Sequence, residues 1–113
     1  MMATQEACLA AINTVVERVN AQDVGKKRER VPQRTVGCTI LDLDLTYVGR
    51  VVGGYIVDIK PSRNHSADMR LICNSDDLVA MVGGDLKFSQ AWSTGRVRID
   101  ASMRDLLRLR SLA

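Results

Sequence analysis

Apolar residues recur every three or four positions near the start of the chain, which places them on one face of a helix. Thr4 stands where a side chain can cap such a helix, and polar residues occupy its other side. The apolar positions are Cys8, Leu9, Ile12, Val15, Val16 and Val19. We predict an N-terminal helix over about residues 4–20, followed by a charged, solvent-exposed connector over about residues 21–34.

The period of the apolar pattern changes to two after this connector. Residues 36–40 alternate between apolar and polar, and residues 41–47 continue the alternation shifted by one position. Such a shift predicts a β-bulge or a strong twist within a long strand. The chain can turn near Gly49 or near Gly53–Gly54, and residues 55–59 then read as a returning strand.

The second half of the chain combines short helices with two further strands. Residues 67–73 alternate as a strand, and a short helix begins at Ser75 and ends at Gly83–Gly84. Residues 86–93 predict another short helix, and residues 96–100 another strand, after which a last helix begins at Ser102. This order predicts an α+β fold with a mainly antiparallel sheet.

A length of 113 residues corresponds to one domain, so we expect a single domain over residues 1–113, with the sheet and C-terminal helices in residues 35–113. The sequence has no apolar run near the roughly 20 residues of a membrane span and none of the features of a secretory signal. Cys8, Cys38 and Cys73 are widely spaced and odd in number, which indicates reduced, inert, apolar thiols. We therefore expect a cytoplasmic protein.

The charge of the chain is mildly positive, with 16 basic and 13 acidic residues and a net charge of +3. This excess is compatible with contact to nucleic acid, lipid headgroups or a phosphorylated ligand but requires none of them. Single-stranded nucleic acids are usually held by stacking on aromatic side chains, and this chain has four aromatic residues in all. We predict no nucleic-acid partner.

Catalytic motifs are missing from the sequence, including those of phosphate-binding loops, dinucleotide sites, zinc proteases and serine hydrolases. His65 stands in a polar stretch with no partner, and residues 49–54 are more typical of a hairpin turn than of a phosphate cradle. Asp42 and Asp44 favour the solvent side of a strand over a cation site. We predict no catalytic residue, no metal site and no cofactor.

Methionines and aromatic residues are concentrated in the last forty positions, on short helices separated by glycines. They serve in part as core, and flexible methionines beside aromatic rings are also what an adaptable apolar cavity uses. The residues are Met81, Phe88, Trp92, Met103, Leu106 and Leu107.

The same region resembles the sterol carrier protein 2 family. The resemblance rests on the stretches Ala67–Leu71, Asp76–Leu86, Gln90–Ile99 and Leu106–Leu109, which give a strand, an acidic helix start, a glycine-ended helix, a helix–glycine–strand step and a Leu-rich last helix. It covers residues 67–113 well and residues 36–59 only loosely. The chain departs from the family pattern at Ala101, where glycine is common, and at Phe88, near a frequent proline.

This resemblance implies a curved five-stranded sheet with helices packed on one face, enclosing an apolar tunnel. It further implies binding and intracellular transfer of sterols, fatty acids or fatty acyl-CoA, without chemistry and with transient contact to an anionic membrane surface. The tunnel lining carried over to this chain is Leu78, Met81, Val82, Phe88, Trp92, Met103, Leu106 and Leu107. Candidates for a headgroup or phosphate are Arg96, Arg98 and Arg104.

A second interpretation keeps this fold but fills the tunnel. The protein would then be a regulatory or interaction domain that forms a homodimer or docks on an enzyme of lipid metabolism. The presence or absence of bound lipid discriminates between the two interpretations.

Overall fold

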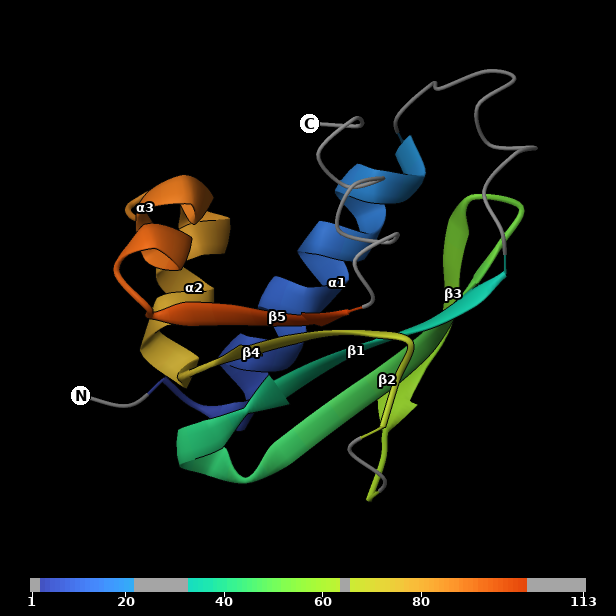
Figure 1. Ribbon diagram of the computed structural model, residues 1–113, viewed down its shortest axis with the longest axis horizontal. Helices are drawn as coiled ribbons and strands as arrows, with labels where there is room; N and C mark the ends of the chain where they lie inside the picture. Colours follow the sequence, from blue (N-terminus) through green and yellow to red (C-terminus); the bar gives the residue numbers. More distant parts are fainter. Residues whose placement is uncertain (1–2, 22–32, 64–65, 102–113) are drawn as a thin grey trace.

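A computed structural model describes residues 3–21, 33–63 and 66–101 of the chain. The helices are α1 (Gln5–Ala21), the 3₁₀ turn η2 (Leu41–Leu43), α2 (Ser75–Gly83) and α3 (Phe88–Ser93), shown in Figure 1. The strands are β1 (Arg34–Ile40), β2 (Leu45–Val52), β3 (Tyr55–Pro61), β4 (Met69–Cys73) and β5 (Val97–Ala101). The helix expected from Ser102 onward lies outside the described residues.

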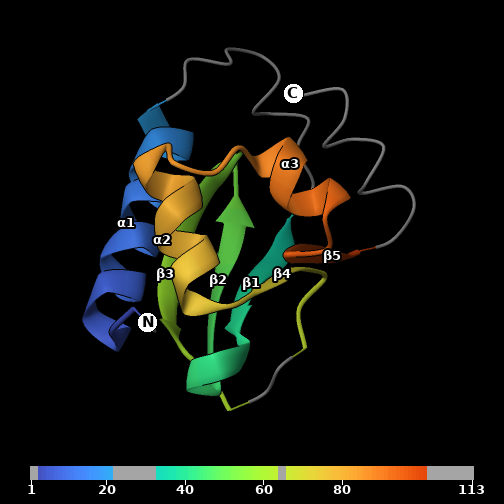
Figure 2. The same ribbon diagram turned by 90° about the vertical axis from the view of Figure 1, so that its left-hand side faces the viewer.

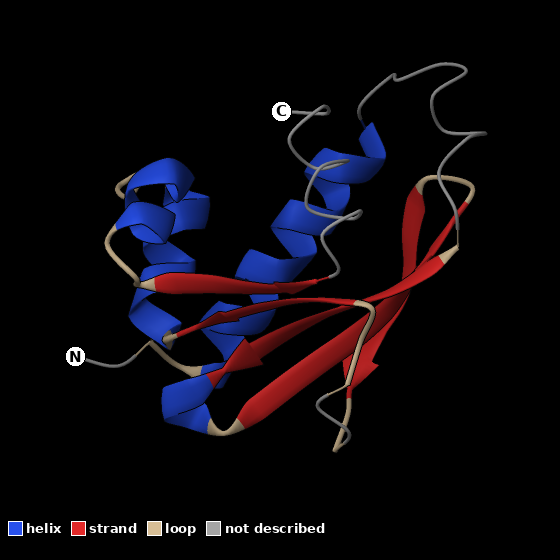
Figure 3. Cartoon of the chain, in the orientation of Figure 1, coloured by secondary structure: helices blue, strands red, loops and turns tan. Residues whose placement is uncertain are grey.

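The five strands form one mixed sheet in the order β3-β2-β1-β4-β5. All neighbouring strands are antiparallel except β1 and β4, which run parallel because the chain crosses from the β3 edge to the other side of β1 before β4. The helices α1, α2 and α3 lie on one face of the sheet (Figures 2 and 3). The prediction of an α+β fold with a mainly antiparallel sheet and helices on one face is confirmed.

The register of the sheet separates an apolar face from a polar one, because directly paired residues point to the same side. Ile40 pairs with Cys73, which pairs with Val97, and all three are buried against the helices. On the opposite face the hydroxyls of Thr39 and Thr46 lie 3.1 Å apart in a hydrogen bond. The predicted alternation of apolar and polar positions therefore corresponds to a helix-covered side and a polar side.

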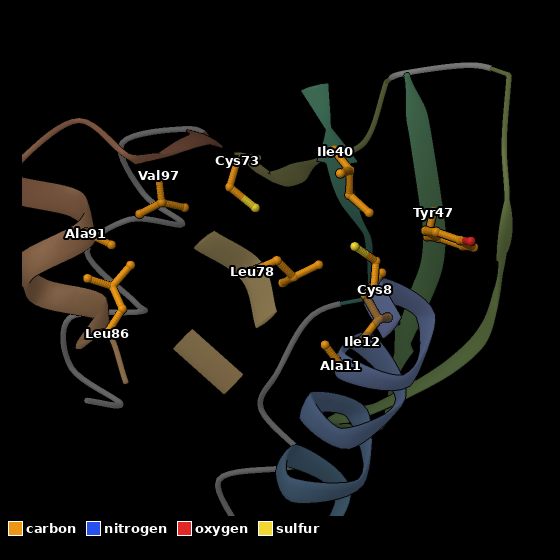
Figure 4. Close-up of a cluster of buried hydrophobic side chains, with 10 residues drawn as sticks. All are labelled: Cys8, Ala11, Ile12, Ile40, Tyr47, Cys73, Leu78, Leu86, Ala91 and Val97. Carbon is orange, nitrogen blue, oxygen red and sulfur yellow. The ribbon is translucent and has the colours of Figure 1, made fainter. Parts of the chain in front are cut away.

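The hydrophobic core is centred on Leu78 of α2. Figure 4 shows this side chain between one group from the α2–α3 connection, α3 and β5 and a second group from α1, β1 and β2. The first group is Leu86, Ala91 and Val97, and Cys73 of β4 belongs to the same core. The second is Cys8, Ala11, Ile12, Ile40 and Tyr47. Leu78 of α2 therefore lies between the two groups and connects them.

The N-terminal helix begins one residue later than predicted, and its cap is confirmed, since Thr4 Oγ1 accepts a hydrogen bond of 3.0 Å from the backbone N–H of Ala7. Its buried side was predicted less well. Ala11 is buried, whereas Leu9 and Val15 are exposed. The helix contacts β3 and α2 along the line of Cys8, Ala11 and Ile12, so residues that flank this line face solvent.

The predicted bulge between residues 40 and 41 is wrong, because the chain reverses direction there. Leu41–Leu43 form the 3₁₀ turn, and Asp44 takes a left-handed conformation with φ of 51° before β2 starts. The bulge lies instead between β2 and β3, at Val48 and Arg50, opposite the left-handed Asp58. The turn at Gly53–Gly54 is confirmed, and Gly49 lies inside β2.

Candidate functional site

On the helix-facing side of β1, β4 and β5, only the row of paired residues next to α2 is fully buried. Two further rows follow the buried row of Ile40, Cys73 and Val97. Their six side chains are all partly buried in the structure. We call this surface the apolar floor, and it comprises Val36, Cys38, Met69, Leu71, Ile99 and Ala101.

The period-two pattern assigns each floor residue to the apolar face of its strand. It did not identify these residues as a candidate site. Alternation shows that Met69 and Leu71 share a face of their strand. It does not show that β4 lies between β1 and β5, which is what brings the three strands together. The floor therefore emerges from the register alone.

Three residues of the predicted lining come from α2. Leu78 is buried at the centre of the core, and Met81 and Val82 are partly buried and pack against the same cluster. The helix that carries them contacts both α1 and α3. Leu78 therefore serves as core, while Met81 and Val82 keep part of their surface open.

Two more residues of the predicted lining, Phe88 and Trp92, form a ring pair on α3. They are four residues apart, which places them on one side of this short helix. Their ring centroids are 5.6 Å apart at an interplanar angle of 57°. Phe88 is 43% and Trp92 49% exposed, so these rings lie at the surface of the molecule.

The candidate headgroup residues lie at different places. Arg96 is exposed directly after α3, where its backbone N–H donates a 2.9 Å hydrogen bond to the carbonyl of Ala91. Arg98 pairs with Ile72 and therefore lies on the polar face of the sheet. The remaining predicted site residues, Met103, Arg104, Leu106 and Leu107, lie outside the described residues.

Of the three thiols, Cys38 belongs to the floor, and Cys8 and Cys73 belong to the buried core. Cys38 and Cys73 share a hydrogen bond, which together with burial raises the pKa of the Cys73 thiol. Burial, and then the nearby carboxylate of Asp42, raises the pKa of Cys8. The protonated form of Cys8 and Cys73 is therefore favoured, whereas the same hydrogen bond lowers the pKa of Cys38, which is only partly buried.

The acidic pair predicted on a strand lies elsewhere. Asp42 belongs to the 3₁₀ turn, where its carboxylate accepts hydrogen bonds from Ser75, and Asp44 ends that turn. His65 lies outside the described residues. Within residues 3–21, 33–63 and 66–101, no cluster of His, Cys, Asp or Glu is placed to hold a metal ion.

A surface hollow of about 560 Å³ lies at the start of α1. Three of its four lining residues are polar, and only Leu9 is apolar; the others are Thr4, Gln5 and Glu6. This lining does not suit a long apolar ligand. None of the described helices is long and apolar enough to cross a membrane.

The family model of the SCP-2 sterol transfer family matches residues 12–113 of this chain. The match covers most of the sequence, including every predicted lining residue. The chain therefore belongs to the SCP-2 sterol transfer family, and the predicted resemblance is confirmed. No curated protein matches this chain in sequence.

Solved structures share the fold at low sequence identity. Sterol carrier protein 2 like 2 from Aedes aegypti is 14% identical with a TM-score of 0.68, over 96% of this chain and 98% of that one. Sterol carrier protein 2 from Aedes aegypti in complex with palmitate is 15% identical with a TM-score of 0.63, over 98% of this chain and 96% of that one.

An enzyme also contains a similar fold. The stereoselective inverting sec-alkylsulfatase from Pseudomonas sp. is 19% identical with a TM-score of 0.53, over 67% of this chain and 12% of that one. The similarity is confined to a small part of that much longer chain. The fold thus occurs both as a separate small protein and within a larger enzyme.

Proposed function

We propose that this protein binds an apolar lipid on the floor of β1, β4 and β5 and carries it between sites, without chemistry of its own. The ligand classes are sterols, fatty acids and fatty acyl-CoA. Membership of the SCP-2 sterol transfer family supports transfer, and the palmitate complex of a structural neighbour supports an acyl chain as ligand. The three free thiols support a cytoplasmic setting.

The observation that carries the proposal is the incomplete cover of the apolar floor. Its residues lie on the helix side and are apolar, yet none is fully buried. An acyl chain placed there gains about 0.8 kcal/mol for each methylene group removed from water. Affinity then depends on a dry apolar surface more than on polar contacts, which explains why broad specificity is expected.

The side chains that would cover the ligand are Met81 and Val82 of α2 and the predicted lining residues of α3 and the C-terminal segment, while Leu78 serves as core. Met81 suits this role because an unbranched, polarisable side chain adapts to ligands of different shape. Arg96 is the headgroup candidate with the best support, since it is exposed next to α3. Arg98, on the polar face, would reach only a headgroup that passes the sheet edge at β5.

Energy transfer from Trp92, the sole tryptophan, to a fluorescent fatty acid tests the proposal directly. We expect saturable transfer in delipidated protein, competed away by unlabelled fatty acid or sterol. A folded protein that gives no transfer and releases no lipid on solvent extraction contradicts the proposal. That result would favour the interaction domain with a filled tunnel, and sedimentation analysis would then test for a homodimer.

A matched pair of variants locates the ligand. Met69 points to the floor, whereas Ile72, on the same strand, pairs with Arg98 on the polar face. Both are partly buried. Met69→Phe places a ring over the floor and should weaken fatty acid binding about tenfold, because the ring occupies ligand space. Ile72→Phe should leave binding unchanged, and equal effects of both changes would contradict a site on the floor.

A further inference from the structure

The two edges of the sheet differ in how well they are protected against a further strand. β3 forms one edge and β5 the other (Figures 1 and 2). At β3, the Asn20 side chain bonds both the N–H and the carbonyl of Ile56, and the left-handed Asp58 lies opposite the register shift. An exposed Lys60 and then Pro61 end this strand. Side-chain cover, bulges, lysine and proline are the features by which edge strands avoid pairing with another chain.

β5 lacks a bulge, a proline and a lysine. Its sequence is VRIDA, its register with β4 is continuous from Val97 to Ala101, and every residue in it has a negative φ. Within residues 3–21, 33–63 and 66–101, β4 is the only strand that pairs with β5. The outer side of β5 is therefore a template on which a further strand can pair.

The side chains of β5 make this strand complementary to a second copy of itself. Consider two antiparallel copies related by a two-fold axis at Ile99. Each Arg98 then lies directly opposite the Asp100 of the other copy, and each Val97 lies opposite Ala101. Directly opposite side chains are neighbours in a sheet, and opposite charges at such positions attract each other. This axis therefore creates two ion pairs between the copies.

Charge and face select this register among the alternatives. A two-fold axis at Arg98 or at Asp100 places like charges opposite each other, which destabilises the pairing. An axis midway between two residues pairs a side chain of the apolar face with one of the polar face, which the alternation of the strand forbids. An axis at Val97 or Ala101 pairs fewer residues, so the axis at Ile99 is favoured.

The two charged residues of β5 lie on the polar face of the sheet, away from the apolar floor. Asp100 pairs with Arg70 in the register and Arg98 with Ile72, and both β5 side chains are exposed. Asp100 Oδ2 lies 3.4 Å from a guanidinium nitrogen of Arg70, yet the Asp100 side chain remains 67% exposed. It can therefore accept a second cation, which Arg98 of another copy supplies.

We propose that β5 is an interface between two copies of this chain, which pair antiparallel about Ile99 and join their sheets into one continuous sheet. The two-fold axis is perpendicular to the sheet, so the helices of both copies lie on the same side and the two apolar floors meet at Ile99. The pairing requires neither a bound lipid nor a filled tunnel, so it stands or falls independently of the proposed carrier function.

The association should be weak, because β5 has five residues and each partner of a stable interface contributes about 20–30. Sedimentation equilibrium of the delipidated full chain, from about 10 μM to about 1 mM, should show a monomer–dimer equilibrium that added salt weakens. Hydrogen exchange of β5 backbone amides should slow as the dimer forms, and exchange in β3 should not change. A chain that stays monomeric over this range overturns the proposal, and slow β5 exchange in that monomer would show that the chain covers its own edge.

Two charge reversals test the register. Arg98→Glu places a carboxylate opposite Asp100 in both pairs, and Asp100→Lys places an ammonium group opposite Arg98. Each variant alone should dimerise at least tenfold more weakly. An equimolar mixture of the two variants should dimerise again, because the mixed pair has opposite charges at both positions. Thermal unfolding checks that each variant folds, and a mixture that stays monomeric overturns the two-fold pairing.

Lys60→Glu is the matched control, since it reverses an exposed charge on the opposite edge strand, β3. It should change the dimerisation constant less than twofold. A loss equal to that in Arg98→Glu would show that net charge, and not the β5 edge, governs association, which overturns the proposal. Dimers that persist unchanged in Arg98→Glu form through another surface and overturn it as well.

Discussion

Asp42 binds both polar groups of Ser75 and thereby joins the β1–β2 turn to the start of α2. Its Oδ1 accepts a 2.8 Å hydrogen bond from the Ser75 backbone N–H, and its Oδ2 accepts a 2.5 Å hydrogen bond from the Ser75 hydroxyl. Ser75 is fully buried, and its Oγ also accepts a 3.1 Å hydrogen bond from the N–H of Ala3. One carboxylate thus fixes the chain start, the turn and the helix relative to each other.

Loss of this carboxylate should destabilise the fold. The Asn74 side chain makes no capping hydrogen bond to α2, so Asp42 supplies the acceptor and the negative charge at the helix N-terminus. Asp42→Ala leaves the buried Ser75 groups without an acceptor, and we expect a loss of about 1–3 kcal/mol in the free energy of unfolding by urea. Asp85→Ala, at an exposed position, is the control and should change it by less than about 0.5 kcal/mol.

The same contact makes stability depend on pH. Desolvation acts to raise the pKa of Asp42, but the hydrogen bonds from the Ser75 hydroxyl and backbone outweigh it, so the pKa is lowered. A carboxyl with a lower pKa in the folded state stabilises the protein above its unfolded pKa of about 3.9. This stabilisation is lost as the pH falls through the folded pKa.

Urea unfolding at pH 6 and pH 3 measures this effect. We expect the unmodified protein to lose stability between these pH values, and Asp42→Asn to lose less, because the amide does not titrate. Asp68 contributes in the same direction, since a hydrogen bond from the Thr35 backbone N–H lowers its pKa. Identical losses in the variant and the unmodified protein would show that Asp42 does not contribute.

The Asp42 contact also shows where prediction from sequence ended. The alternation of Leu41, Leu43 and Leu45 continues the strand pattern, so the turn could not be distinguished from a bulged strand. In the structure Leu41 is 55% exposed, because the chain reverses at this point. The reversal is stabilised by Ser75, more than thirty residues away, and a local pattern carries no information about such a partner.

Local patterns were sufficient elsewhere. Capping by Thr4, the glycine end of α2 and the alternation in β5 depend on neighbouring residues, and the structure confirms them. The apolar floor depends on strand order instead. Met81 and Val82 could be predicted as lining residues because helix periodicity and family resemblance agree, whereas Val36 and Met69 needed the register of β1 and β4.

Gly49 should tolerate no larger side chain. A Cβ atom at this position would lie 2.4 Å from Cδ1 of Ile59 and 3.0 Å from the carbonyl oxygen of Val57. Ile59 can move, but the carbonyl belongs to the paired strand, so Gly49→Ala should cost about 1–3 kcal/mol in thermal or urea unfolding. The control is Gly83→Ala in α2, where a Cβ meets nothing within 4 Å, and it should stabilise by about 0.4–1 kcal/mol.

Asn20 protects the edge of the sheet at β3. Its side-chain amide donates a 3.0 Å hydrogen bond to the carbonyl of Ile56, and its carbonyl accepts one of 2.9 Å from the Ile56 N–H. Asn20→Ala removes both hydrogen bonds, so hydrogen exchange of the Ile56 backbone amide should become at least tenfold faster. A tenfold change corresponds to a loss of about 1.4 kcal/mol in the free energy of local opening. Asn13→Ala, at an exposed position of the same helix, should leave this exchange unchanged.

Met81 gives the sharpest test of the predicted lining, because its side chain packs against the core and keeps part of its surface open. We expect Met81→Trp to abolish saturable binding of the fluorescent fatty acid, since the indole occupies ligand space. The free energy of unfolding should change by less than about 1 kcal/mol. Leu107→Trp should behave in the same way, and Asn13→Trp controls for the added fluorophore. A loss of about 1–3 kcal/mol with ligand binding retained would instead assign Met81 to close-packed core, where a larger side chain causes strain.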